Sequence, residues 1–121
     1  MKILKSIFRH YMAPAQFETA IAFYEQLQQQ GCERRLSFSE VGIDVAVIGS
    51  FILLSGSEEA LAPVRHVQAA FVVDSVDAFT AWLVTQGADV PPTVHKNLAG
   101  RNVTVRHADG FVAEYFEPAA A

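Results

Sequence analysis

The sequence contains one structural unit twice, and this duplication restricts the possible folds more than any other feature. Apolar residues recur at the spacing of one helical face in two stretches, Phe17–Gln30 and Val76–Gln86. Aligning Gly31 with Gly87 superimposes the two stretches without a gap. The alignment pairs identical residues: Ala22 with Ala78, Phe23 with Phe79, Leu27 with Leu83 and Gln30 with Gln86. We therefore expect two helices of common origin in a duplicated fold.

The ends of these helices are also predicted. Gly31 and Gly87 are expected to terminate them, and Asp74 is placed to cap the second. The apolar stripes predict buried faces, made of Phe17, Ala20, Ile21, Tyr24 and Leu27 in the first helix, and of Val76, Phe79, Trp82 and Leu83 in the second.

Strand-like segments surround the two helices in the same order, one before each helix and three after it. In the first copy they are Ile3–Tyr11, Arg34–Ser39, Ile43–Ile48 and Phe51–Ser55, and in the second Val67–Val73, Asp89–His95, Arg101–His107 and Phe111–Glu117. Gly49-Ser50 is suited to a two-residue hairpin loop, and Asp109-Gly110 to a type I′ turn.

This order predicts an α+β fold of two tandem βαβββ units, about residues 1–56 and 64–118, within a single domain spanning residues 1–121. A chain of this length buries roughly two thirds of its unfolded surface in one core. We expect the two units to form a curved mixed sheet, with alternate strand residues lining a concave cleft.

Charge and composition exclude several classes of function. The net charge of −4 gives no general attraction for a phosphate backbone, so nucleic acid is not an expected partner. The first twelve residues contain Lys2, Lys5 and Arg9, and no apolar stretch is long enough for a signal peptide or a membrane span. The lone Cys32 fits a reducing compartment, and we expect a cytoplasmic protein.

Three segments together resemble one known superfamily: Phe23-Tyr24, the run Ala70–Asp77, and the run Asp109–Tyr115. In order and spacing they are similar to the glyoxalase, bleomycin-resistance and extradiol-dioxygenase proteins, also called the vicinal oxygen chelate superfamily. The resemblance covers nearly the whole chain. It implies a small-molecule ligand in the cleft and a homodimer, but it names no reaction, since members include metal-dependent lyases, dioxygenases and drug-sequestering proteins.

The resemblance also implies a set of metal ligands, on the first strand of each unit and on the last. Glu114 matches the last-strand carboxylate, and Gln68 occupies the first-strand position of the second copy. His66 shares a face with Gln68 and could replace it if the strand were long enough. Arg9 occupies the corresponding position in the first copy, and His10 could serve only if the register shifted by one residue.

Two alternatives follow for the cofactor: one divalent metal (zinc, iron, manganese or nickel) held at Glu114, or none. The first-copy counterpart of Glu114 is Leu54, which offers no ligand. Without a metal, Glu114 would be an inward carboxylate paired with Arg106 of the neighbouring strand. Arg106 and Asn102, which share a strand face, are candidate ligand-binding residues, as is Arg9.

Three functions remain open at this point. The first is a metal-dependent lyase or dioxygenase in which Glu114 ligates the metal or moves a proton. The second is a metal-free protein that binds or sequesters a drug or an anionic metabolite, with Arg106 as its anchor. The third is a structural or interaction protein whose cleft is filled by its own side chains, such as Leu54, Val72, Val112 and Phe116.

Overall fold

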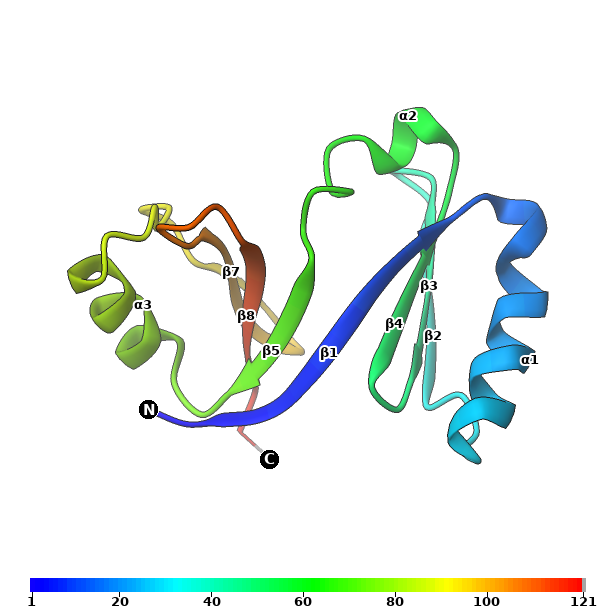
Figure 1. The fold of residues 1–121 in the computed structure, drawn as a ribbon, viewed down its shortest axis with the longest axis horizontal. Coiled ribbons are helices and arrows are strands. Elements are labelled where there is room, and N and C mark those ends of the chain that lie inside the picture. Colours follow the sequence, from blue (N-terminus) through cyan, green and yellow to red (C-terminus); the bar gives the residue numbers. More distant parts are fainter. Residues whose placement is uncertain (121) are drawn as a thin grey trace. The chain divides into compact units, whose positions relative to one another are not determined.

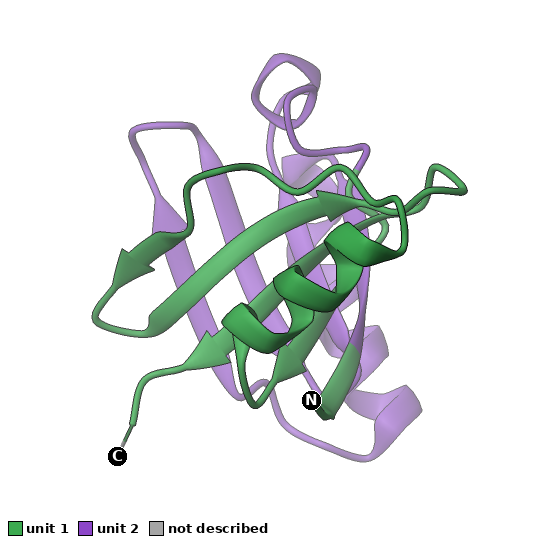
Figure 2. Ribbon diagram, turned by 90° about the vertical axis from the view of Figure 1, so that its left-hand side faces the viewer, with its two compact units in different colours: residues 1–6, 67–121 green, residues 7–66 purple. Residues whose placement is uncertain are grey.

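The structure is a computed structural model that describes residues 1–120, and the chain divides into two compact units (Figure 2). Unit 2 comprises Ile7–His66, and unit 1 combines Met1–Ser6 with the chain from Val67 onward. The first strand therefore contributes residues to both units, although the sequence predicted that it would belong to the first copy alone.

Unit 2 contains one βαβββ motif (Figure 1). Its elements are β1 (Ile3–Met12, of which residues 7–12 lie in this unit), the short 3-10 helix η1 (Pro14–Gln16), α1 (Phe17–Gln28), β2 (Arg34–Phe38), β3 (Ile43–Ile48), β4 (Phe51–Ser55) and the one-turn helix α2 (Glu58–Leu61). The strand order is β2-β3-β4-β1. β1 pairs in parallel with β4, and the other pairs are antiparallel.

Unit 1 contains the second βαβββ motif. Its elements are β5 (Ala69–Val73), α3 (Val76–Thr85), β6 (His95–Asn97), β7 (Gly100–Arg106) and β8 (Val112–Pro118). The strand order is β5-β8-β7-β6, with β5 parallel to β8 and the rest antiparallel. The predicted α+β class and the duplicated unit are confirmed.

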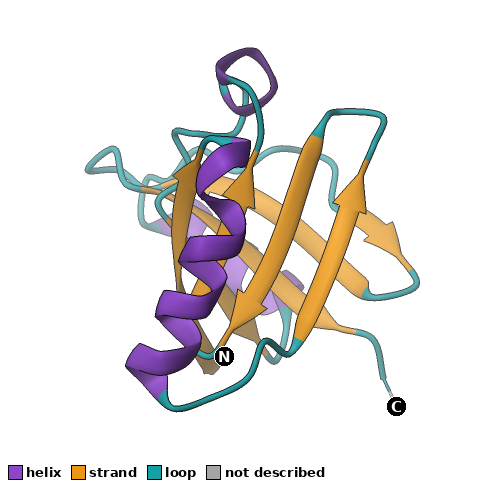
Figure 3. Cartoon of the chain, turned by 90° about the vertical axis from the view of Figure 1, so that its right-hand side faces the viewer, coloured by secondary structure: helices purple, strands orange, loops and turns teal. Residues whose placement is uncertain are grey.

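Each unit has its own core between its long helix and one face of its strands, and α1 lies along its strands in Figure 3. In unit 2, Phe17 and Ile21 of α1 pack with Ile48 and Leu53. On the other face of these strands, Leu54 packs with further apolar residues and with the fully buried Leu61 of α2. In unit 1 the core is formed by α3 residues with residues of β5, β7 and β8: Val73, Val76, Phe79, Leu83, Val103, Val105, Ala113 and Tyr115.

The helix ends differ in detail from the prediction. α1 stops at Gln28 because Gln29 adopts a left-handed conformation (φ 51°), two residues before Gly31. α3 is capped by Ser75, whose hydroxyl accepts the amide of Ala78, and not by Asp74. Asp74 instead accepts the backbone amide of Lys2, which lowers the pKa of its carboxyl group. Gly87 does follow the end of α3 with positive φ, as predicted.

In each helix, the predicted buried stripe included one residue that is exposed in the structure. Leu27 is 59% exposed and Trp82 is 46% exposed, although both were predicted to be buried. Each lies at the edge of the apolar stripe of its helix, and neither belongs to the core cluster of its unit. An exposed leucine is unremarkable, but an exposed tryptophan leaves a large apolar surface uncovered.

One strand and one turn of unit 1 were also predicted incorrectly. Of the expected strand Asp89–His95, Asp89 makes only an isolated bridge with Arg106, and His95 begins the short strand β6. Pro91 and Pro92 lie between them and cannot donate to a strand ladder. The β7–β8 turn is not type I′. Gly110 has a positive φ of 95°, but Asp109 does not. The backbone amide of His107 donates a hydrogen bond to the carbonyl oxygen of Phe111, as in a three-residue loop.

No helix among residues 1–120 has both the length and the apolar character required to cross a membrane.

Candidate functional site

The strands of unit 1 present two chemically different faces. Residues paired across β7 and β8 point to the same side, so Val103 and Val105 join Ala113 and Tyr115 on the side covered by α3. The alternating residues form the opposite side, which faces away from α3. They are Asn102, Thr104, Arg106, Val112, Glu114 and Phe116. We refer to this set as the open face of unit 1.

Glu114 is near the middle of the open face and is half-buried. The register places Thr104 directly opposite it on β7 and Ala70 directly opposite it on β5. Its neighbours are thus a hydroxyl group on one side and a single methyl group on the other. The predicted sharing of a face by Glu114 with Val112 and Phe116, and by Arg106 with Asn102 and Thr104, follows from this register.

Arg106 is at the end of the same face, opposite Val112, and is therefore a diagonal neighbour of Glu114. Diagonal positions on antiparallel strands are about 7–8 Å apart, within reach of long side chains. Arg106 is exposed and donates one hydrogen bond, 3.4 Å long, to the carbonyl oxygen of Gly110. Since a guanidinium group carries five N–H donors, most of its capacity can still be directed at an anion.

Gln68 uses its side chain to extend the strand pairing. Its backbone amide donates to the carbonyl oxygen of Val112 (2.8 Å), and its side-chain oxygen Oε1 accepts the amide of the same residue (3.1 Å). That oxygen is the atom through which a glutamine would bind a cation. In this structure it replaces a strand hydrogen bond immediately before β5, so Gln68 has a structural role.

His66 is in a turn outside the strand. β5 begins at Ala69, and His66 is an exposed turn residue three positions earlier. Its proposed role depended on a strand long enough to include it, and this condition is not met. The β1 side chains of unit 2 are also placed by register, because His10 pairs with Leu53 on the side of α1 and Arg9 pairs with Ile52 on the other side.

Arg9 is held by its neighbour on that second side. Its Nε donates to the hydroxyl of Tyr11 (2.7 Å), and this hydroxyl donates to the carbonyl oxygen of Val64 (2.8 Å). The guanidinium group of Arg65 also lies 5.9 Å from the centre of the Tyr11 ring. Arg9 is therefore a fixed cation suited to an anionic group and not to a metal.

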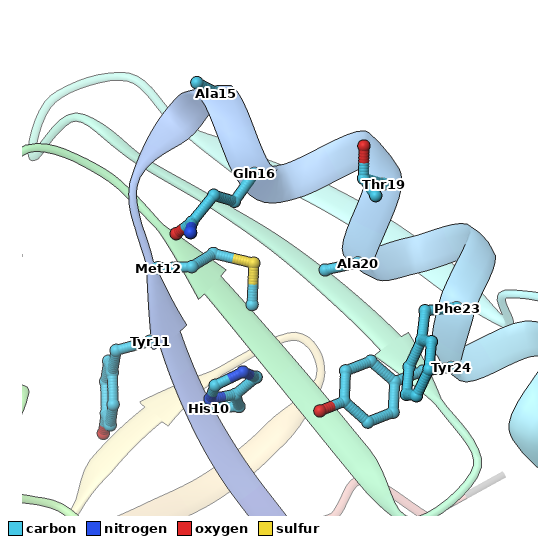
Figure 4. A pocket seen from close by; sticks show the side chains of 9 residues that line it. All are labelled: His10, Tyr11, Met12, Ala15, Gln16, Thr19, Ala20, Phe23 and Tyr24. Carbon is cyan, nitrogen blue, oxygen red and sulfur yellow. The ribbon is translucent and has the colours of Figure 1, made fainter.

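His10 lines an open pocket of about 470 Å³ between the end of β1 and α1 (Figure 4). The imidazole and the ring of Tyr24 point toward one another, with their centres 5.9 Å apart. Met12 and Gln16 approach from the other end of the pocket. This pocket was not predicted from the sequence. There, His10 was a candidate only as a metal ligand, and only if a register shift moved it to the strand face that Arg9 occupies.

The donor set of the described residues does not fit the metal site that the resemblance implies. Among residues 1–120 there is no group of three or more His, Cys, Asp or Glu side chains that could hold a metal ion. Glu114 has Thr104 and Ala70 as its strand neighbours, and the Gln68 oxygen is engaged with Val112. A catalytic zinc site takes three protein ligands.

Solved structures resemble this chain over its whole length. A protein from Methanosarcina mazei, described as uncharacterized, shares 40% identity with a TM-score of 0.84, over 100% of this chain and 97% of the other. The chain belongs to the family of this Methanosarcina mazei protein. No protein-family model and no curated protein matches the sequence.

More distant structures identify the fold of this family. Methylmalonyl-CoA epimerase from Mycobacterium tuberculosis is 20% identical, with a TM-score of 0.69 over 99% of this chain and 94% of the other. A second methylmalonyl-CoA epimerase is 15% identical, with a TM-score of 0.71 over 94% and 95%. These enzymes belong to the vicinal oxygen chelate superfamily, and the family therefore has the α+β glyoxalase-like fold.

Proposed function

We propose that this protein binds a small organic acid that also carries a hydrogen-bond donor, on the open face of unit 1 and without a resident metal. The observation that supports this proposal most is the register of β7 and β8. It places Thr104 directly opposite Glu114, and Arg106 diagonal to the Glu114 carboxylate. The pair supplies an acceptor and a hydroxyl, and Arg106 supplies a cation.

The chemistry of the ligand follows from these three groups. A carboxylate on the ligand matches the planar N–H donors of Arg106. A hydroxyl group on the ligand can donate to Glu114 and accept from Thr104, since a hydroxyl has both capacities. Asn102 and Phe116, directly opposite each other on the same strands, provide an amide and an apolar ring for the rest of the molecule.

The proposed site leaves catalysis open. Glu114 can accept a hydrogen bond, and it can also accept a proton from a bound molecule, as a general base does. The fold neighbours named as methylmalonyl-CoA epimerases support the choice of an organic acid, as an expectation from fold likeness.

Three matched probes test the ligand class: lactate, propionate and 1,2-propanediol. Lactate has both the acid and the hydroxyl, and each of the others lacks one of them. We expect amide chemical-shift changes at Thr104 and Glu114 that saturate with lactate, and weaker binding of the other two. Equal responses to all three probes, or none, would contradict the proposal.

Two substitutions assign the contacts. Glu114→Gln should weaken lactate but leave propionate unchanged, and Arg106→Gln should weaken both acids but not the diol. Glu59→Gln, on the exposed first turn of α2, is the matched control for a lost carboxylate. If Glu114→Gln fails to fold, Thr104→Val removes the paired hydroxyl with little change in volume.

The absence of a resident metal is tested separately, by metal analysis of the purified protein after dialysis against manganese, iron, cobalt, nickel and zinc. We expect less than stoichiometric metal both in the wild type and in Glu114→Ala. A stoichiometric metal that is lost in the variant would refute this part of the proposal and support the metal-dependent enzyme.

A further inference from the structure

A second pocket in unit 1 is on the other side of the strands from the open face. It has a volume of about 320 Å³ and lies between the end of α3 and the β7–β8 hairpin. Trp82 and Gln86 of α3 line it from one side, and His107, Asp109 and Tyr115 from the other. The volume is at the lower end for small-molecule sites and suits a molecule of one or two rings.

Two hydrogen-bonding groups meet in this pocket. The Nε2 atom of His107 and the hydroxyl oxygen of Tyr115 are 2.6 Å apart. Tyr115 is 4% exposed, and this burial raises the pKa of its hydroxyl group. The imidazole is half-buried and also lies against Phe111, with ring centres 5.5 Å apart. The pair thus combines a buried hydroxyl with an accessible ring.

The duplicated unit provides an internal comparison. In unit 2, the corresponding space between α1 and the β3–β4 hairpin is bridged by Gln28. Its Oε1 accepts the Ser50 amide (2.9 Å), and its Nε2 donates to the Ile48 carbonyl oxygen (2.9 Å). By the repeat alignment, the counterpart of Gln28 in α3 is Val84, which is 60% exposed.

Two other positions around this pocket are polar in unit 2 and aromatic in unit 1. Trp82 replaces Gln26 of α1, and Tyr115 replaces Ser55 of β4. Unit 1 has therefore lost the polar bridge and gained aromatic groups at the same place. Trp82 leaves the predicted core stripe, and it lines a pocket as a result. An exposed tryptophan beside a buried hydroxyl is typical of a ligand pocket, where apolar walls accompany a few polar groups.

We propose that this pocket is a second small-molecule site, which binds a neutral phenol-type ring with its hydroxyl group against Tyr115 and His107. The ring would contact the indole of Trp82, since aromatic pairs are favoured beyond the area that they bury. The Tyr115 hydroxyl can donate or accept, depending on the tautomer of His107, and a phenol matches either state. The carboxylate of Asp109 at the rim disfavours an anionic ligand.

The sequence contains a single tryptophan, so its fluorescence reports on this pocket alone. The probes are phenol, toluene, which lacks the hydroxyl, and cyclohexanol, which lacks the aromatic ring. We expect phenol to change the emission of Trp82 saturably, with a dissociation constant on the order of 1 mM, and the other two to bind more weakly. Quenching that rises linearly without saturation, or equal binding of cyclohexanol, would overturn the proposal.

A pair of tyrosine variants localises the hydroxyl contact. Tyr115→Phe should weaken phenol about three- to tenfold and leave toluene unchanged, because one hydrogen bond is lost. Tyr24→Phe removes the same group from the His10 pocket of unit 2 and should leave both probes unchanged. Equal loss of phenol binding in the two variants would refute the assignment.

The three-probe comparison in the wild-type protein remains decisive if Tyr115→Phe does not fold. A failure of lactate to bind the open face would leave this result unaffected, because the two sites lie on opposite sides of the strands of unit 1 and use different probes.

Discussion

Replacing Gln28 by alanine should destabilise the β3–β4 hairpin, because one side chain satisfies several peptide groups there. Its amide nitrogen Nε2 donates to the carbonyl oxygens of Ile48 (2.9 Å) and Tyr24 (3.2 Å). Its Oε1 accepts the Ser50 amide (2.9 Å). Gly49 lies between Ile48 and Ser50 and has a φ of 55°. A Cβ atom at this position would collide with Oε1 of Gln28. The close approach of Gln28 to the turn therefore requires glycine at position 49.

The magnitude follows from the two bonds to the hairpin. Each intramolecular hydrogen bond contributes about 0.5–1.5 kcal/mol net, so the two together contribute about 1–3 kcal/mol. Ser50 is exposed and water can replace its bond in the variant, which reduces our expectation to about 1–2 kcal/mol. In a domain of this length that corresponds to a fall in the melting temperature of roughly 3–10 °C.

The assay is urea unfolding of three variants beside the wild type. Gln28→Ala should lose about 1–2 kcal/mol. Gln28→Glu keeps an acceptor for Ser50 but turns a carboxylate toward the Ile48 carbonyl oxygen, so it should be no more stable than the alanine variant. Val84→Ala, at the equivalent exposed position of α3, is the control and should change stability by less than about 0.5 kcal/mol. A Gln28→Ala protein as stable as this control would refute the reasoning.

Three further predictions concern the carboxylate of Glu117, the hydroxyl of Tyr115 and the assembly of the chain. Glu117→Ala should cost about 1–2 kcal/mol in thermal or urea unfolding, because its Oε1 accepts the amide of the buried Val76 at the start of α3 (2.8 Å), and Glu117→Gln should recover at least half of the loss. Burial raises the pKa of Tyr115, so above about pH 10 the unfolded chain releases this proton before the folded chain does, and stability falls as the pH rises through the folded pKa. Tyr115→Phe should reduce this alkaline loss in urea unfolding followed against pH, and an unchanged alkaline slope would contradict it. Sedimentation equilibrium should give the mass of a homodimer, which the family resemblance implies, and a monomer mass at all concentrations would contradict that expectation.

The repeat in the sequence predicted the fold because helix and strand periodicities are local properties. Ile43–Ile48 and Phe51–Ser55 were predicted to the residue, since alternating apolar residues and a two-residue turn define both strands and their register. Asp89–His95 was predicted incorrectly. It contains two adjacent prolines, which have no N–H group to donate to a neighbouring strand.

The candidate site was less predictable, because side-chain partners depend on residues far apart in the sequence. The position of Gln68 in the chain suggested a metal ligand, but its oxygen bonds to the Val112 amide, 44 residues away. His10 and Arg9 are adjacent, and only the pairing of β1 with β4 decides which of them shares a side with α1. The helical pattern put Trp82 in the apolar stripe of α3 and so predicted a buried residue, whereas its side chain is 46% exposed.

The two copies of the unit have diverged in a way that concentrates polar chemistry in unit 1. In unit 2, the strand face opposite α1 is closed: Leu54 packs there with Val45 and with Leu61 of the connecting segment, and Leu61 is fully buried. In unit 1 the counterpart of Leu54 is Glu114, opposite a hydroxyl group, on a face that α3 does not cover.

A buried apolar cluster stabilises a fold by removing apolar surface from water, whereas a carboxylate opposite a hydroxyl places an acceptor and a donor side by side. Under the proposed function, the Glu114 face of unit 1 presents binding groups, whereas the Leu54 face of unit 2 is part of the apolar core. We therefore predict that Leu54→Ala lowers stability, and that substitution of the exposed Arg106 on the Glu114 face alters ligand binding at nearly constant stability.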